Sequence, residues 1–347
     1  MRRKTGILII LAVVLIILLT VLIKIFDAEK KADRESTSAA DKTTTSGFVG
    51  GGGELPGRTT EAETEIPTEE PTTGEDIELY GTIYPYDTEE IDLSGTEVGG
   101  VQGIDYLIDT LSRFGQLRKV DMCDCGLDNE TMEELTKRFP DVKFVWKVTL
   151  GLWTIRTDCV AFSTLKDGTI TYRLTNEDVK VLKYCTDMVA LDLGHNKVTD
   201  ISFLQYMPEL RILILVDNRV EGHDDQYISD LSWLKYTPKL RYLEFFVGSV
   251  SDISFLYDLP ELVDLNISYN PISEVEYLMK LPKIERLYLE HTLLTEEDYK
   301  LLQQTYPNAQ VVYYGEGSVD QGWREHERYF AMIDMYRNNY VHELFLD

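Results

Sequence analysis

Side chains that commonly carry catalysis or bind metals are scarce in this sequence. Its 347 residues include four cysteines and five histidines, and motifs such as G-x-S-x-G and H-E-x-x-H are absent. Acidic residues are abundant throughout, so their number alone identifies no catalytic carboxylate pair. We therefore expect a protein that is not an enzyme and that carries no cofactor.

Positive charge is also in deficit. Lys and Arg together number 34 against 60 Asp and Glu, which gives a formal net charge of -26 and a pI of about 4.6. A surface of this sign repels phosphate, so nucleic-acid binding is not expected and basic or neutral partners fit better. The composition, 44% hydrophobic and 27% charged, is nevertheless that of a folded protein with a sizeable core.

The few cysteines are not spaced as a metal site. Cys123 and Cys125 form a C-x-C pair with no second pair nearby, so we expect no zinc. Cys125 falls on a position of the repeat described below where a small buried residue is expected, while Cys123 would point outward. Cys159 and Cys185 lie far along the chain, so free thiols and extracellular disulfides both remain open.

Two further short stretches invite a search for ligands. "EGHDDQ" at 221–226 groups one histidine with three acids, which usually means a solvated loop, and a divalent cation site is the alternative. The run "GGGG" at 50–53 lacks the strand, the lysine and the Ser or Thr of a phosphate-binding loop. We interpret it as linker.

A long apolar run lies near the N-terminus. Residues 7–23 contain a single polar residue, Thr20, and about 20 residues at 1.5 Å per residue cross a hydrocarbon core of roughly 30 Å. The run is longer than the core of a cleaved signal peptide, which is the alternative, so we predict an uncleaved transmembrane helix over 5–26. Basic residues precede the helix, which favours a cytoplasmic tail at 1–4 and an extracellular remainder.

The segment after the predicted helix, residues 27–78, is predicted to be a disordered linker. From about residue 35 it is rich in Thr, Glu, Gly and Pro and offers almost nothing to bury. A random coil of about 50 residues averages on the order of 40 Å end to end. Such a stalk lifts a folded domain off the lipid headgroups.

The rest of the chain is repetitive. Units start at residues 188, 210, 240, 262 and 284. Three are 22 residues long, one is 25, and the unit that starts at 210 is 30 because eight residues are inserted after Val220. Within a unit such as "LDLGHNKVTDISFL" the apolar spacing changes from 2 to about 3. The first spacing predicts a short strand, and Asp before "IS" or "LS", at Asp200, Asp230 and Asp252, predicts a 3₁₀ turn.

These units resemble the leucine-rich repeat family, whose pattern is L-x-x-L-x-L-x-x-N/C-x-L. The pattern is met by Leu210, Leu213, Leu215, Asn218 and Val220, and again by Leu262, Leu265, Ile267, Asn270 and Ile272. The predicted fold class is therefore α/β: a leucine-rich repeat solenoid with a curved parallel β-sheet and a 3₁₀ or α-helical convex side. No unit can bury its own apolar side, so neighbouring units must stack.

Related patterns extend upstream. We predict N-terminal repeats over 79–148, an inserted β-hairpin segment over 149–174, where alternation and turn residues interrupt the repeat, and further repeats over 175–315. The last segment, 316–347, places apolar residues on one helical face. A helix that caps the open end of the solenoid is the first interpretation, and a partner-binding helix is the alternative.

The predicted concave face carries an unusual set of side chains. Residues that flank the strand leucines should point away from the core and meet solvent. They include Ile212, Ile214, Val216, Tyr242, Glu244, Phe246, Asp264 and Tyr288. An apolar, aromatic patch with a charged rim is typical of a protein-binding site. The alternative is internal cover by the 149–174 hairpin, by the 221–229 insertion or by a second copy of the chain.

Units of the "TDISFLQYMPEL" style resemble the bacterial surface repeats of the internalin type. The resemblance implies a membrane-anchored, extracellular, non-catalytic protein that binds a protein, or a glycan, on its concave face for adhesion or recognition. Host-cell invasion is not implied, because the N-terminal anchor and the ending "YVHELFLD" depart from that type. The alternative function is an accessory or sensor subunit of a membrane or envelope complex.

Overall fold

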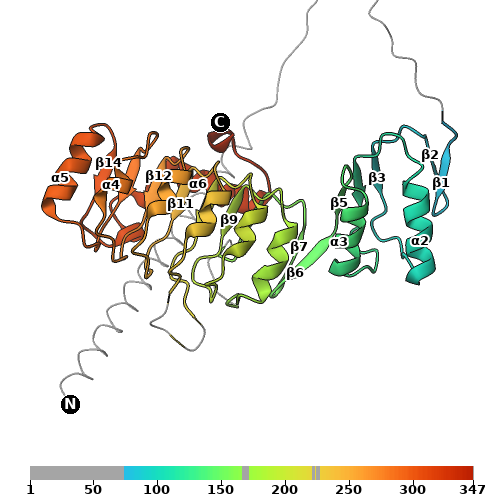
Figure 1. Cartoon of the computed structure of the whole chain (residues 1–347), viewed down its shortest axis with the longest axis horizontal. Helices are drawn as coiled ribbons and strands as arrows, with labels where there is room; N and C mark the ends of the chain where they lie inside the picture. Colours follow the sequence, from blue (N-terminus) through green and yellow to red (C-terminus); the bar gives the residue numbers. More distant parts are fainter. Residues whose placement is uncertain (1–73, 166–171, 221–222, 224–226, 347) are drawn as a thin grey trace, which may run out of the picture. The chain divides into compact units, whose positions relative to one another are not determined.

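The computed structural model describes residues 74–165, 172–220, 223 and 227–346 (Figure 1). The predicted transmembrane helix at 5–26 and most of the predicted linker lie outside these residues. Within the described ranges, no helix is long and apolar enough to cross a membrane. The acidic stretch at 221–226 is also outside them, apart from His223.

Seven short strands form one parallel sheet in chain order. They are β8 (Ala161–Ser163), β9 (Ala190–Asp192), β10 (Ile212–Ile214), β11 (Tyr242–Glu244), β12 (Asp264–Asn266), β13 (Arg286–Tyr288) and β14 (Gln310–Val312). Each strand therefore pairs only with the strand of the preceding and the following repeat. The prediction of a parallel repeat sheet is confirmed.

The middle residues of these strands form one column across the sheet. The paired residues are Phe162, Leu191, Leu213, Leu243, Leu265, Leu287 and Val311. All are buried except Val311, which is partly buried against the same core. Strands in a sheet lie about 4.8 Å apart, so each middle side chain packs directly on those of its neighbours. This column is the reason that the repeats stack.

A buried asparagine follows the strand in three repeats and joins each repeat to the one before it. Asn270 Nδ2 donates to the carbonyl of Phe245 (2.8 Å) in the preceding repeat and to that of Ile267 (3.1 Å) in its own, while Oδ1 accepts from the amide of Val250 (3.2 Å). Asn218 makes the equivalent bonds, and Asn196 reaches the preceding segment through the hydroxyl of Thr164 (3.0 Å). The amide satisfies backbone groups that the turn leaves without a partner.

The residue before each of these asparagines is left-handed. His195, Asp217 and Tyr269 have φ values of 59°, 50° and 56°. A non-glycine residue in this region costs roughly 1–2 kcal/mol, and here the asparagine bonds hold the turn in place.

Short helices form the opposite side of the repeats (Figure 1). They are η1 (Asp178–Tyr184), η2 (Ser202–Tyr206), η3 (Ser232–Tyr236), η4 (Ser254–Asp258), α4 (Val275–Leu278) and α5 (Glu296–Thr305). Asp200, Asp230 and Asp252 each accept the amide of the serine two residues later at 2.9 Å, which starts η2, η3 and η4. The 3₁₀ turns predicted after these aspartates are confirmed.

An N-terminal array precedes the seven-stranded sheet. It contains the antiparallel pair β1 (Ile77–Leu79) and β2 (Thr82–Tyr84), then β3 (Glu90–Asp92), α2 (Gly100–Leu111), β4 (Lys119–Asp121), α3 (Asn129–Arg138) and β5 (Lys143–Val145). Strands β3, β4 and β5 are parallel. β1 begins inside the segment predicted as linker. Cys125 is buried at the asparagine position, and its thiol donates to the carbonyl of Leu93 in the preceding repeat (3.0 Å).

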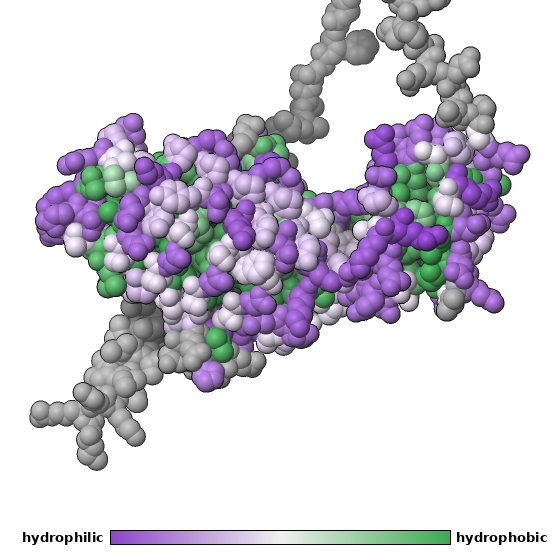
Figure 2. Space-filling model, in the orientation of Figure 1, coloured by the Kyte–Doolittle hydropathy of each residue, from purple (hydrophilic) through white to green (hydrophobic). Residues whose placement is uncertain are grey.

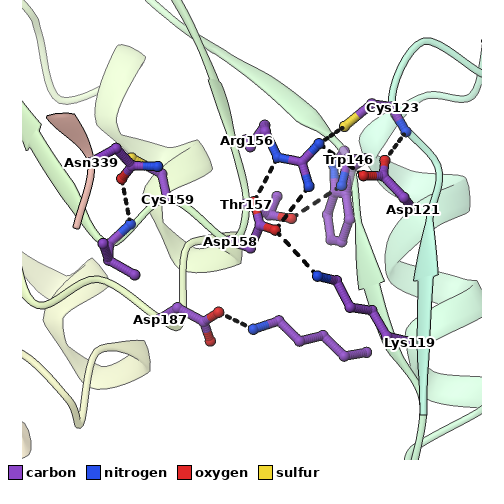
Figure 3. Close-up of polar contacts among 12 residues, drawn as sticks. Lys119, Asp121, Cys123, Trp146, Arg156, Thr157, Asp158, Cys159, Asp187 and Asn339 are labelled. Carbon is purple, nitrogen blue, oxygen red and sulfur yellow. Dashed lines mark hydrogen bonds and ion pairs between the residues drawn. The ribbon is translucent and has the colours of Figure 1, made fainter. Parts of the chain in front are cut away.

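The antiparallel pair β6 (Lys147–Leu150) and β7 (Trp153–Arg156) lies between the two arrays and overlaps the start of the segment predicted as a hairpin, 149–174. Strand β8 of the parallel sheet also lies within that segment. Arg156 contacts Asp158 (2.8 Å), Asp121 (2.8 Å) and the Sγ of Cys123 (3.3 Å), as Figure 3 shows. Cys123 is buried beneath this guanidinium, so the prediction that it points outward is wrong. All four cysteines are free thiols.

Charged and polar residues cover most of the described surface on the side drawn in Figure 2, and apolar residues reach it in smaller groups. This distribution agrees with the acidic composition. The apolar residues of the sheet strands are mostly buried in internal contacts.

Replacing Asn270 by Ala tests the asparagine bonds. The change leaves buried carbonyl and amide groups without a partner, so we expect the free energy of unfolding to fall by about 3 kcal/mol. Chemical denaturation measures this value. The exposed Asn308→Ala is the control and should lie within about 0.5 kcal/mol of the parent. Equal effects of the two changes would contradict the structural role of Asn270.

Candidate functional site

The residues that flank the central column define the concave face, and the structure buries them. Ile212, Ile214, Val216, Tyr242, Glu244, Asp264 and Tyr288 are all buried, and Phe246 is partly buried against them. The structure therefore brings the eight predicted site residues onto one surface. The expectation that this surface meets solvent is wrong.

The cover is the C-terminal segment, residues 316–346. It consists of η5 (Gly317–Val319), η6 (Trp323–Glu325), α6 (Glu327–Asn338) and η7 (Glu343–Phe345). Helix α6 contacts β8 and β9, at the opposite end of the sheet from β14. A helix is thus present where the apolar spacing predicts one. It lies across the concave face instead of closing the last repeat, because its apolar side matches the apolar side chains of that face.

Apolar contacts provide the first part of this interface. Trp323 is fully buried, with its ring 5.1 Å from that of Tyr242 and 4.8 Å from that of Tyr288. The guanidinium of Arg286 lies 4.5 Å from the centre of the same indole. Four residues of α6, Ala331, Met332, Met335 and Tyr336, are buried in the same cluster, and so is Phe345. Burying a side chain of this size contributes about 2 kcal/mol.

An ion-pair group lies beside Trp323. The buried carboxylate of Asp264 accepts from Arg286 Nε (2.8 Å) and, through both oxygens, from Arg328 Nε (2.7 Å) and Nη2 (2.9 Å). Arg286 Nη1 also donates to the carbonyl of Trp323 (3.0 Å). Bidentate arginine–carboxylate pairs are strong and directional. This group fixes the C-terminal segment to the middle of the sheet.

Glu244 forms a second, looser pair with the segment. Its carboxylate is fully buried and accepts from the hydroxyl of Tyr242 (3.0 Å) and from Arg324 Nη2 (3.4 Å). Arg324 Nη2 also donates to the hydroxyl of Ser318 (3.2 Å). Two acids on neighbouring strands are therefore each paired with an arginine of the C-terminal segment.

The C-terminal end of α6 is held by the side chain of its capping residue, Asn339. Asn339 is left-handed (φ 50°), and its Oδ1 accepts from the amides of Val160 (2.9 Å) and Ala161 (3.2 Å) and from the thiol of Cys159 (3.2 Å). Figure 3 shows this contact. One side-chain oxygen thus accepts hydrogen bonds from two backbone amides at the start of the edge strand β8. Arg211 similarly donates to the carbonyl of Phe345.

The near end of the segment approaches the sheet closely. Gly317 has φ +68°, and a Cβ at this position would lie 2.0 Å from the ring of Phe246. Only glycine fits both the left-handed backbone and the contact. The segment therefore begins to cross the face at a position that accepts only glycine.

Burial changes the acid–base behaviour of two carboxylates on this face. Burial raises the pKa of Asp192, whose oxygens accept from Ser163 Oγ (2.8 Å) and from the amide of Gly194 (2.9 Å). Burial also raises the pKa of Glu290 to about 7, although the hydroxyl of Ser268 donates to it and acts in the opposite direction. Glu290 therefore changes charge near neutral pH.

A small cavity of about 70 Å³ lies between the face and the segment. It is lined by Ser163, Leu165, Asp192, Gly194, His195, Ile214, Val216, Glu244, Arg324, Tyr329, Ile333 and Tyr336. A cavity of this size has room for water. In the described ranges, no group of three or more His, Cys, Asp or Glu residues is placed to hold a metal ion.

No protein-family model matches the chain, and no curated protein matches it significantly. Among solved structures, it is similar to internalin C2 of Listeria monocytogenes, with 20% identity over 64% of this chain and 76% of that chain and a TM-score of 0.33. It is also similar to an internalin (inlF) of the same species, with 18% identity over 68% of this chain and 86% of that chain and a TM-score of 0.33. A leucine-rich repeat protein of Leptospira interrogans has 13% identity over 61% of this chain and 46% of that chain, with a TM-score of 0.32. These similarities carry no argument about function.

The fold is of the leucine-rich repeat type by its own geometry, with one parallel strand per repeat, a column of buried leucines and a buried asparagine after the strand. The repeat pattern in the sequence identifies the concave face but not the segment that covers it. A signal was present, because acids at strand positions such as Glu244 and Asp264 have complementary arginines, Arg324 and Arg328, in the C-terminal segment. Assigning each arginine to its acid requires knowing which repeats the C-terminal segment crosses.

Replacing Arg328 by Ala tests the central ion pair. The change leaves the buried carboxylate of Asp264 with one arginine instead of two, so we expect the free energy of unfolding to fall by about 3 kcal/mol. The control is Arg337→Ala, an exposed arginine of the same helix. Its effect on urea unfolding should be below about 0.5 kcal/mol. If Arg328→Ala were as stable as its control, Asp264 would not anchor the segment.

The raised pKa of Glu290 predicts a pH effect on stability. Its pKa is about 7 in the folded chain against 4.5 for the ordinary group, so the folded state holds the proton more tightly. Stability from this group is therefore full below about pH 4.5 and is lost as pH rises toward and past 7. Between pH 5 and 8 we expect the free energy of unfolding of the parent to fall. The corresponding fall for Glu290→Gln should be smaller by on the order of 2 kcal/mol.

The exposed Glu297→Gln provides the matched control for this measurement. Thermal or urea unfolding is followed at several pH values for the three proteins. Glu297→Gln should keep the pH dependence of the parent. A Glu290→Gln curve with the parent's slope would show that Glu290 is ionised without cost in the folded chain.

Proposed function

We propose that this chain is a membrane-anchored, extracellular recognition protein without catalytic activity. The concave face of its leucine-rich repeats is the binding surface for a protein partner. The observation that carries the proposal is that this face already holds a polypeptide segment. Five successive strands, β9 to β13, supply the buried side chains against which the C-terminal segment packs.

The contacts have the make-up of a protein-binding site. A buried tryptophan, Trp323, occupies the centre, where large anchors dominate binding energy. Charge-assisted bonds from Arg324 and Arg328 to Glu244 and Asp264 set the register of the segment. The face therefore has the chemistry needed to select one polypeptide from others.

The groups around the face support a binding role over a catalytic one. The hydroxyl of Ser163 donates to the carboxylate of Asp192, and that of Tyr242 donates to Glu244. Neither hydroxyl has an imidazole as its acceptor, which is the arrangement that activates a hydroxyl as a nucleophile. These hydroxyl groups position charges and close the interface.

Membrane attachment is proposed from the sequence. The apolar run at 7–23 is long enough to span a bilayer, and the Thr, Glu, Gly and Pro tract after it would act as a stalk. The acidic charge of the chain favours a basic or neutral partner.

A membrane-impermeant lysine crosslinker on intact cells tests the proposal. We expect the chain to be captured together with a protein partner before lysis, while an abundant cytoplasmic protein stays unlabelled. The captured complex is recovered with an antibody against the exposed side of α5 and identified by mass spectrometry. Labelling of the chain only after lysis would contradict the extracellular placement, and labelling without any attached protein would contradict the recognition role.

A further inference from the structure

The concave face collects the buried charges of the molecule. In the part of the chain that the structure describes, the buried charged residues are Asp192, Glu244, Asp264, Arg286 and Glu290, and all lie on this face. Four acids and one arginine give a formal charge of -4 + 1 = -3. Without the C-terminal segment, the sheet would thus present an acidic surface with exposed tyrosines. Such a surface fits a ligand that places guanidinium and aromatic groups against it.

The C-terminal segment supplies these groups in one short stretch, in which the two glutamates, Glu325 and Glu327, are exposed. "WREHER" at 323–328 places the buried Trp323 next to Arg324, and Arg328 follows four residues later. The indole packs against the two tyrosine rings, tilted to one and edge-on to the other, while the two guanidinium groups reach two different acids. The segment thus occupies the face as a ligand would.

The boundary between face and segment holds buried polar atoms that no protein group pairs. In the described ranges, the buried side-chain nitrogen and oxygen atoms without a hydrogen-bond partner are Asn266 Nδ2, Arg286 Nη2, Glu290 Oε1, Trp323 Nε1, Arg324 Nε and Tyr336 Oη. All six belong to the concave face or to the segment that covers it. Each such atom costs about 1–3 kcal/mol unless water or a ligand pairs it.

We propose that the C-terminal segment is a resident ligand of the concave face and that the partner is a protein segment of the same chemistry. The partner would carry an aromatic side chain beside an arginine, with a second arginine four residues on, and would bind after displacing residues 316–346. This inference rests on the proposed function, because it names the partner's chemistry and the regulation of that same surface.

Tethering gives the resident segment an advantage that the partner must overcome. A short linker holds a tethered group at an effective concentration on the order of millimolar. If the face is closed 99% of the time, the apparent affinity of a competitor falls by about 100-fold. Weakening the resident segment without changing the face should therefore strengthen binding of a free segment.

A labelled peptide with the sequence of residues 316–346 is the probe, and fluorescence anisotropy measures its binding to the full chain. The variants are Arg328→Ala, which removes the bidentate pair with Asp264, and the control Arg337→Ala. We expect Arg328→Ala to bind the peptide at least tenfold more tightly than the parent or the control. A peptide with alanine in place of both face-binding arginines should lose this binding.

Gly317→Ala provides a second variant in case Arg328→Ala does not fold. It disturbs the start of the segment, where a Cβ would clash with Phe246, and leaves the acids of the face and both arginines in place. Circular dichroism verifies that each variant is folded. Gly317→Ala should also bind the peptide more tightly than the parent.

Three results would overturn the inference. These are equal peptide affinity for parent, control and folded variants, equal binding of the arginine-free peptide, and formation of dimers that exchange their C-terminal segments, detected by light scattering. If crosslinking on cells succeeds while any of these results is found, recognition occurs but does not use displacement. If the peptide behaves as expected while crosslinking fails, the displacement mechanism holds and the cell-surface role is wrong.

Discussion

The structure depends on one constraint: a three-residue strand has two faces, and in this sheet both of them must be buried. On one face the column through Leu213 and Leu265 solves the problem by stacking repeats. On the other face stacking cannot help, because the flanking side chains of β10 to β13 point away from that column. The C-terminal segment supplies the missing layer, so the architecture of the repeats and the path of the chain's end form one solution.

Buried charge makes this second layer unlike an ordinary core. A parallel sheet covered on both faces usually consists of aliphatic residues, whereas this one holds Asp264 and Glu244 at zero exposure. Replacing a buried ion pair by apolar residues is often neutral or stabilising, so such pairs contribute more to specificity than to stability. The acids set which segment can lie on the face and in which register. That property suits the recognition role proposed for this surface.

Local spacing explains what could be predicted from the sequence. The strand leucines, the asparagine at Asn270 and the aspartate before each 3₁₀ turn act within one repeat of about 22 residues, so the pattern fixed the parallel sheet and the identity of the concave residues. The cover was not predictable in this way. Arg328 and Asp264 are 64 residues apart, and Asn339 and Ala161 are 178 apart. No periodicity links such pairs, and the helical spacing of α6 says only that it has an apolar side.

The central claim, that the C-terminal segment fills the concave face, is tested most directly by nuclear Overhauser effects from the indole of Trp323. Its ring lies 5.1 Å and 4.8 Å from the rings of Tyr242 and Tyr288, so cross-peaks from the indole to both tyrosines are expected in solution. The indole should also exchange its proton slowly, because Trp323 is fully buried. Absence of both cross-peaks together with fast exchange would contradict the account.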